Sequence, residues 1–292
     1  MTSPAVSNPM SAVAIPRGFR AHSVIPGFGL SAGIIVAAIS LIVLIPLGAV
    51  VAKAATAESA AFWAIALSPR TLAALRLSFG AALGAAVVNA VLGTIVAWVL
   101  VRYQFPFRRL IDAAIDMPFA LPTSVAGIAL AALYAPNGWL GEPLERLGLK
   151  VGFTPWGVFV ALIFVGVPFV VRSVQPVLAE LDAELEEASA LLGAGRLRTI
   201  FAVILPQLLP AIGTGAILAF ARAVGEYGSV IFIAGNVPMI SEIAPLLIVI
   251  RLEQFDYAGA AVVGFLMLLI SFLMLLAVNQ LQAMSGRKFG HG

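Results

Sequence analysis

The stretch ELDAELEEASALLGAGRLRTIFAVILPQLLP, residues 180–210, is a strongly charged interruption in a chain that is otherwise almost continuously apolar. Just before and within it, leucine and alanine recur at steps of three and four residues, namely Leu178, Leu181, Leu185, Ala188 and Leu192. This spacing is typical of an amphipathic helix, and the acidic residues fall off the apolar stripe. Gly193 and Gly195 should end that helix, and a second short helix should follow before Pro206 and Pro210 open the next apolar segment. The sequence therefore predicts a helix–turn–helix between two hydrophobic segments, where something soluble can hold the protein.

Composition places the whole chain in a membrane. Of its 292 residues, 61% are hydrophobic and 11% are charged, and the mean hydropathy is +1.06. Soluble domains are about 45–50% apolar and about 25% charged. The formal net charge of +3 is expected in loops, where it sets orientation in the membrane and does not indicate nucleic-acid binding. Cysteine is absent, which excludes disulfides, thiolate catalysis and Cys-ligated metal centres.

Six segments are long and apolar enough to cross a bilayer, which takes about 20 helical residues. They are residues 30–52, 72–101, 111–135, 156–177, 208–234 and 258–281. Residues 243–250 are too few to span and predict a short helix on the extracytoplasmic side. The expected organisation is a flexible cytoplasmic tail over residues 1–28, a six-helix membrane domain over 29–283 and a cytoplasmic tail over 284–292. The predicted fold class is all-α.

The distribution of lysine and arginine predicts the orientation. With a cytoplasmic N-terminus, the cytoplasmic side holds Arg17, Arg20, Arg102, Arg108, Arg109, Arg172, Arg196, Arg198, Arg287 and Lys288. The opposite side holds Lys53, Arg70, Arg146, Lys150 and Arg251. Because positive residues gather on the cytoplasmic side, both termini and the charged stretch are expected in the cytoplasm.

The chain lacks the usual sites of catalysis and of ATP binding. It contains no Gly-x-x-x-x-Gly-Lys-Ser/Thr loop, so ATP would have to be bound by a partner. Its two histidines, His22 and His291, lie in the tails, away from any carboxylate cluster. We therefore expect no cofactor or metal on this chain and no enzymatic activity of its own.

The spacing Glu187-Ala188-Ser189, Gly193, Leu205-Pro206 resembles the cytoplasmic loop of permease subunits of bacterial ATP-binding cassette (ABC) importers. In that family the pattern is Glu-Ala-Ala, three residues, Gly, nine residues, Ile-x-Leu-Pro, so Ser189 and Val203 are mild departures. The resemblance implies a type I ABC importer permease fold with a cytoplasmic coupling helix seated in a cleft on the ATPase. Residues 180–206 would form that coupling loop. An amphipathic helix on the membrane surface is the alternative, but such helices carry basic polar faces and this one is acidic.

The leucines of the stripe fit such a docking role, because they can enter an apolar groove while flanking charges set the register. The residues expected to couple to the ATPase are Leu181, Leu185, Glu187, Ala188, Ser189, Leu192, Gly193, Leu205 and Pro206.

Further segments are similar to the sulfate/thiosulfate importer permease, T-type, over about residues 30–281. They are MPFALPT at 117–123, PFVVRSVQP at 168–176, GEYGSVIFIAGN at 225–236 and RLEQFDY at 251–257. The resemblance implies a complex with a paralogous permease, two copies of an ABC ATPase that hold ATP and Mg, and a periplasmic binding protein that delivers sulfate or thiosulfate. It implies a multi-pass protein of the bacterial inner membrane, in contact with lipid and not with nucleic acid.

Two charged residues, Arg222 and Glu226, fall one helical turn apart inside the fifth predicted span. Either they contribute to the path of the anion or they form a structural pair, and the structural role is favoured because a paired arginine attracts an anion weakly. Thr123 and Asn236 are further candidates for the path or an interface. The alternatives of function are a molybdate/tungstate permease and an ion-coupled secondary transporter that would use Glu226 as its ion site.

Overall fold

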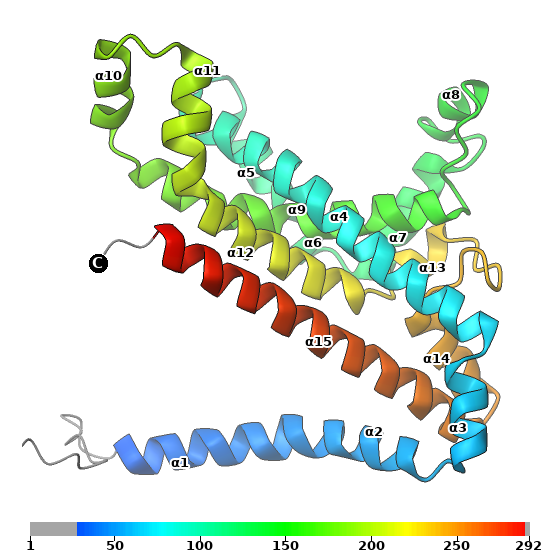
Figure 1. Ribbon diagram of the computed structural model, residues 1–292. Helices are drawn as coiled ribbons and strands as arrows, with labels where there is room; N and C mark the ends of the chain where they lie inside the picture. Colours follow the sequence, from blue (N-terminus) through cyan, green and yellow to red (C-terminus); the bar gives the residue numbers. More distant parts are fainter. Residues whose placement is uncertain (1–27, 290–292) are drawn as a thin grey trace, which may run out of the picture. The chain divides into compact units, whose positions relative to one another are not determined.

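The computed structural model describes residues 28–289, which form helices joined by turns and loops, without strands (Figure 1). This confirms the all-α fold class. In order, the elements are α1 (Phe28–Ile39), the π-helix η1 (Ser40–Leu44), α2 (Ile45–Ala55), α3 (Ser59–Ala66), α4 (Pro69–Arg102), α5 (Arg108–Ile115), α6 (Met117–Ala120), α7 (Thr123–Tyr134), α8 (Gly141–Arg146), α9 (Pro155–Glu180), α10 (Ala183–Leu191), α11 (Arg196–Thr199), the π-helix η2 (Ile200–Ile204), α12 (Leu205–Val224), α13 (Val230–Ile233), α14 (Ala244–Glu253) and α15 (Tyr257–Phe289).

The chain divides between Ala49 and Val50 into two compact units. In the first unit, α1 and η1 run into α2 as part of an apolar helix, and its large side chains, such as Leu30, Leu41 and Leu44, are exposed. Residues 1–27 and 290–292 lie outside the described residues, and the predicted division into tail, membrane domain and tail stays a prediction.

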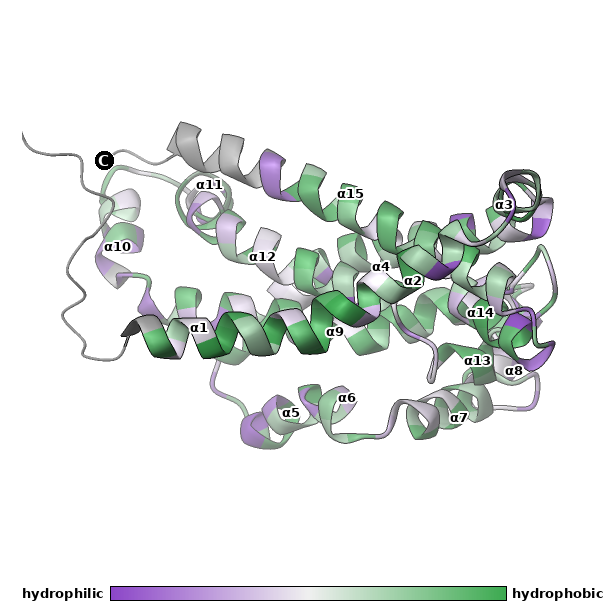
Figure 2. Ribbon diagram, turned by 90° about the horizontal axis from the view of Figure 1, so that it is seen from below, coloured by the Kyte–Doolittle hydropathy of each residue, from purple (hydrophilic) through white to green (hydrophobic). Residues whose placement is uncertain are grey.

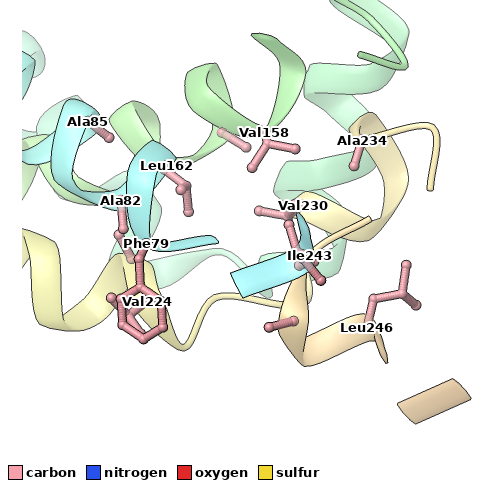
Figure 3. Close-up of a cluster of buried hydrophobic side chains, with 14 of the residues drawn as sticks. Phe79, Ala82, Ala85, Val158, Leu162, Val224, Val230, Ala234, Ile243 and Leu246 are labelled. Carbon is pink, nitrogen blue, oxygen red and sulfur yellow. The ribbon is translucent and has the colours of Figure 1, made fainter. Parts of the chain in front are cut away.

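Three long helices, α4, α9 and α12, pack together in the second unit and hold its core. Figure 3 shows part of this core, where Phe79, Ala82 and Ala85 of α4 lie near Val158 and Leu162 of α9. The same cluster includes Val224 at the end of α12 and Val230 of α13. It also includes Ala234, just after α13, Ile243, just before α14, and Leu246 of α14. A second buried cluster includes Leu100, Val174 and Leu208, also on α4, α9 and α12. The three helices thus form the frame that positions the loops at both ends.

Small residues bring these helices close together. A Cβ atom on Gly93 of α4 would lie 2.7 Å from Val170 Cβ, and one on Gly215 of α12 would lie 2.7 Å from Val170 Cα. Both distances are shorter than real carbon contacts allow, so α4 and α12 each need a glycine where they pass Val170 of α9. These two glycines are therefore packing positions between helices.

Among the described residues, five helices are long and apolar enough to cross a membrane: Leu30–Ala55, Pro69–Arg102, Pro155–Glu180, Arg196–Val224 and Tyr257–Gln280. Figure 2 shows α15 as mostly hydrophobic, whereas α5 and α10 carry hydrophilic residues. The prediction of one continuous third span over residues 111–135 is wrong, because the chain there forms α5, α6 and α7. Pro122 explains the main break: the residue before a proline disfavours the helical region, and Leu121 is extended with ψ 138°. The apolar helix α7 has 12 residues, too few to span alone.

The fifth predicted span differs at both ends. Its helix begins at Arg196 and not near Leu208, and it ends at Val224 and not at Ala234. A turn over Gly225 to Ser229 then leads into the four-residue α13. The short helix expected near residues 243–250 is confirmed as α14, where Pro245 lies in the first turn and does not interrupt the helix. Its side of the membrane stays a prediction.

The two π-helical segments each end two residues before a proline. Ile45 N–H donates to Ser40 C=O ahead of Pro46, and Leu205 N–H donates to Ile200 C=O ahead of Pro206. A proline ring clashes with the carbonyl four residues earlier, and a wider turn relieves that clash. The Leu205-Pro206 pair therefore lies inside a continuous helix, which runs from α11 through η2 into α12, and does not start it.

Candidate functional site

The charged stretch forms a hairpin of two short helices, α10 and α11, which project together beyond the long helices (Figure 1). Gly193 makes the turn with a φ of 80°, in the left-handed region that favours glycine. Gly193 N–H donates to Ala190 C=O at 3.0 Å, and Ala194 N–H donates to Ser189 C=O at 3.0 Å. This pair of bonds is the Schellman motif, which satisfies the last carbonyls of a helix. Gly195 is different, because its φ of −70° suits any residue.

The predicted leucine stripe does not lie on one helix. Helix α9 ends at Glu180, Leu181 is extended with ψ 121°, and α10 begins only at Ala183. Leu178 is buried in the core and Leu181 packs against it, whereas Leu185 and Leu192 are exposed. The single amphipathic helix is therefore wrong: the chain bends, and the stripe divides into a core half and an outward half.

The end of the hairpin presents large apolar side chains to the outside. Leu191 is 89% exposed and Leu192 is 88% exposed, and Leu197 of α11 and Phe201 of η2 are also exposed. Leu191, Leu197 and Phe201 were missing from the predicted set because they do not continue the three-and-four spacing. Large exposed apolar side chains on a charged hairpin are what a soluble partner with an apolar groove would bind.

The other predicted coupling residues take different positions. Glu187 and Ala188 are exposed on α10, whereas Leu205 and Pro206 are half-buried in the π-to-α junction. Ser189 is buried and its Oγ lies 2.8 Å from Oγ1 of Thr199, which joins α10 to α11. The Ser189 side chain therefore faces the hairpin's own second helix.

Arg172 of α9 anchors the neighbouring helices α5 and α6 through its guanidinium. Its Nη1 donates to Asp112 Oδ1 at 2.8 Å, and its Nε and Nη2 donate to the two carboxylate oxygens of Asp116 at 2.9 and 2.6 Å. Gln175 Nε2 donates to Asp112 Oδ1 at 3.1 Å. The pKa of the Asp112 carboxyl in α5 is lowered, chiefly by the hydrogen bond from Gln175 and further by Arg172, while burial opposes the shift. This network fixes the segment that follows α4 onto α9.

Arg222 and Glu226 form an ion pair, but Glu226 lies after the end of α12 and not within a helical span. The buried Glu226 carboxylate also accepts hydrogen bonds from Ser229 N and Ser229 Oγ, both at 2.9 Å. These bonds hold the turn that separates α12 from α13. Gly228 of the same turn lies against α7, because a Cβ on it would be 2.2 Å from Thr123 Oγ1. The geometry thus joins the breaks in the third and fifth predicted spans.

Asn236 completes that region by closing the end of α13. Its Nδ2 donates to Ile231 C=O at 2.8 Å, and its backbone is left-handed with a φ of 55°. Asparagine tolerates this conformation better than most residues with a side chain. Within residues 28–289, no cluster of three or more His, Cys, Asp or Glu side chains could hold a metal ion.

Known proteins resemble this chain both in sequence and in fold. Residues 89–290 match the family model described as binding-protein-dependent transport system inner membrane component. A solved structure of a bacterial alginate ABC transporter, in complex with an alginate-bound periplasmic protein, contains a chain that superposes with a TM-score of 0.72. That match covers 90% of this chain and 95% of the other at 15% sequence identity, so it shows the fold alone.

Two relatives with closer sequences cover nearly the whole chain. A probable sulfate transport system permease protein of Nephroselmis olivacea is 52% identical over 84% of this chain and 86% of that protein. The sulfate transport system permease protein of Escherichia coli is 45% identical over 92% of this chain and 97% of that protein. The family match, the shared fold and these relatives lead to one conclusion: the chain belongs to the family of inner membrane components of binding-protein-dependent transport systems, the permeases of ABC importers.

Proposed function

We propose that this chain is a transmembrane permease subunit of an ATP-driven sulfate and thiosulfate importer. The observation that carries the substrate class is the identity of 45% or more, over most of both chains, to proteins named sulfate transport system permeases. The chain forms part of the translocation path and couples it to ATP hydrolysis on partner subunits. Its working partners are a paralogous permease, two copies of an ABC ATPase that bind ATP and Mg, and a periplasmic sulfate-binding protein.

The hairpin of α10 and α11 is the surface that docks on the ATPase. The exposed Leu191 and Leu192 support this proposal, because side chains of that size leave water favourably only when a partner covers them. Leu185 of α10 is exposed as well, and Glu187 adds a charge that fixes the register. ATP-driven closure of the partner subunits then moves the hairpin together with the helices it joins.

Both termini and the hairpin lie in the cytoplasm. Lysine and arginine are more frequent in the segments assigned to the cytoplasmic side than in those assigned to the opposite side, which supports this orientation. Two cytoplasmic termini need an even number of crossings, whereas five helices in the part of the chain that the structure describes are long enough to cross. The broken segment of α6 and α7 therefore supplies the sixth crossing, and the joint between the two helices at Leu121 and Pro122 needs cover from protein, because irregular backbone is not exposed to lipid.

The Arg222–Glu226 pair is structural. The hydrogen bonds from Ser229 to the buried Glu226 support this assignment, because they use the carboxylate to hold a turn and leave it little freedom to bind and release an ion. An Arg222→Gln variant tests it. Loss of assembly supports the structural role, whereas normal assembly with lost transport would assign Arg222 to the path of the anion.

Uptake in a host that lacks its own sulfate importer tests the proposed function directly. Coexpression of the chain with its neighbouring transport genes should restore uptake of radiolabelled sulfate, with thiosulfate competing and molybdate competing weakly. Copurification should bring down an ATPase subunit, and a charged residue in place of Leu192 should lower that copurification. Preferential competition by molybdate would assign the chain to a molybdate importer instead.

A further inference from the structure

The hairpin is tied to two core helices by polar side chains on its inner side. Glu186 and Ser189 are three residues apart on α10, which places them on one face of the helix. Glu186 Oε1 accepts a hydrogen bond from Arg102 Nη2 at 2.5 Å, and Arg102 is the last residue of α4. Ser189 Oγ lies 2.8 Å from Thr199 Oγ1, and Thr199 ends α11, which runs on into η2 and α12. The inner face of α10 is therefore connected to both α4 and α12.

The tie to α4 is held in place from two sides. The Arg102 guanidinium lies 5.8 Å from the ring centroid of Trp98, one turn earlier on α4, which is within cation–π range. The side chains of Arg102 and Glu186 are 26% and 37% exposed. An ion pair that is partly buried and stacked on an aromatic ring is less mobile than a pair of free surface side chains.

The covalent connection from α9 into α10 is less rigid than these ties. Leu181 and Asp182 have extended backbones, with ψ angles of 121° and 126°, so no helical hydrogen bonds continue across the joint. A displacement of α10 at this joint can be absorbed by rotation about two residues. By contrast, the contacts of Glu186 with Arg102 and of Ser189 with Thr199 link α10 to residues inside helices, with no extended segment in between.

We propose that Arg102 is a positioning residue for transport: its ion pair with Glu186 transmits the displacement of the docked hairpin to α4, while Ser189 and Thr199 transmit it to α12. This inference rests on the proposed function, in which the hairpin docks on an ATPase. It assigns to the end of α4 a role in coupling that its sequence does not reveal. Without the ion pair, the ATPase still docks on the hairpin and hydrolyses ATP, but the displacement of the hairpin no longer moves α4.

The test is the ratio of sulfate transported to ATP hydrolysed, measured in proteoliposomes that contain the whole importer with its binding protein. Arg102→Gln and Glu186→Gln should each lower this ratio about fivefold, at the upper end of the range measured for single ion pairs of limited burial. The double variant should be no worse than either single one, because the two side chains act through one contact. Arg146→Gln is the matched control: it breaks an exposed pair with Glu142 on α8 and should leave the ratio unchanged.

The possible results separate this inference from the proposed function. An unchanged ratio in both single variants overturns the inference, and so does an additive loss in the double variant. If either single variant loses the ATPase subunit, the pair serves assembly and not transmission, which also overturns it. A Thr199→Val variant, which removes the second tie with little change in volume, should lower the ratio as well. If the unaltered complex contains no ATPase or moves no sulfate, the proposed function itself fails.

Discussion

Replacing Gly193 by alanine should loosen the hairpin by a calculable amount. A Cβ at Gly193 would meet nothing within 4 Å, so the change introduces no clash. Its cost comes from the φ of 80° alone, and a left-handed backbone costs a residue with a Cβ about 1–2 kcal/mol. The free energy of local opening of α10 should fall by that amount, which corresponds to an opening equilibrium raised about 5- to 30-fold.

Hydrogen–deuterium exchange of the full-length protein in lipid nanodiscs measures this effect, because amides that exchange through local opening follow the opening equilibrium. The amides of α10 should exchange about 5- to 30-fold faster in Gly193→Ala, while those of α9 keep their rates. Gly195→Ala is the matched control: this glycine also has free space around it, but its φ of −70° suits alanine. Gly193→Asn should fall between the two, since asparagine tolerates the left-handed region.

Two results would refute this reasoning. If the amides of α10 exchanged equally faster in Gly193→Ala and Gly195→Ala, the effect would come from losing a glycine and not from the left-handed φ at residue 193. Unchanged exchange in Gly193→Ala would mean that the hairpin turn in solution is not the Schellman turn seen here.

Three further predictions concern the core, the α5 anchor and the docking surface. Gly215→Ala should destabilise the protein by about 1–3 kcal/mol through overpacking, since its Cβ would lie 2.7 Å from Val170 Cα. Gly80→Ala should not destabilise it, because its Cβ meets nothing within 4 Å and alanine favours a helix more than glycine does. Thermal unfolding in detergent compares the two. Arg172→Met removes charged hydrogen bonds to Asp112 of α5 and to Asp116 between α5 and α6. Each is worth about 1.5–3 kcal/mol, so limited proteolysis should cut residues 103–116 faster while α10 keeps its resistance. Leu192→Glu should lower copurification of the ATPase without changing the thermal stability of the permease, because the side chain is 88% exposed; an equal loss of stability would contradict a docking role.

Much of this architecture follows from hydropathy and spacing. Long apolar runs without strong breakers, such as the one that becomes α4, gave the right helices to within a few residues. The hairpin turn at Gly193 also follows from sequence, because a glycine after an amphipathic run is a common C-terminal signal. The motif spacing in residues 180–206, and the position of these residues between apolar segments, indicated the family, which the comparisons confirm.

The differences arise where the backbone is broken inside apolar sequence. Hydropathy does not register the extended Leu121 before Pro122, nor the turn that Glu226 and Ser229 hold after α12. Leu178 and Leu192 share a periodicity but lie on opposite sides of the bend at Leu181, since three-and-four spacing holds only along an unbroken helix. Contacts between residues far apart in sequence, such as Arg172 with Asp112, have no local signal at all.

The central claim is that ATP hydrolysis on partner subunits drives sulfate through this permease. Its most direct test is the uptake of radiolabelled sulfate by proteoliposomes that contain the purified complex, its binding protein and a fixed internal concentration of ATP. Our account predicts accumulation that requires ATP and the binding protein and that is unaffected when an uncoupler collapses the ion gradients. Uptake that continues without ATP and stops with the uncoupler would contradict it.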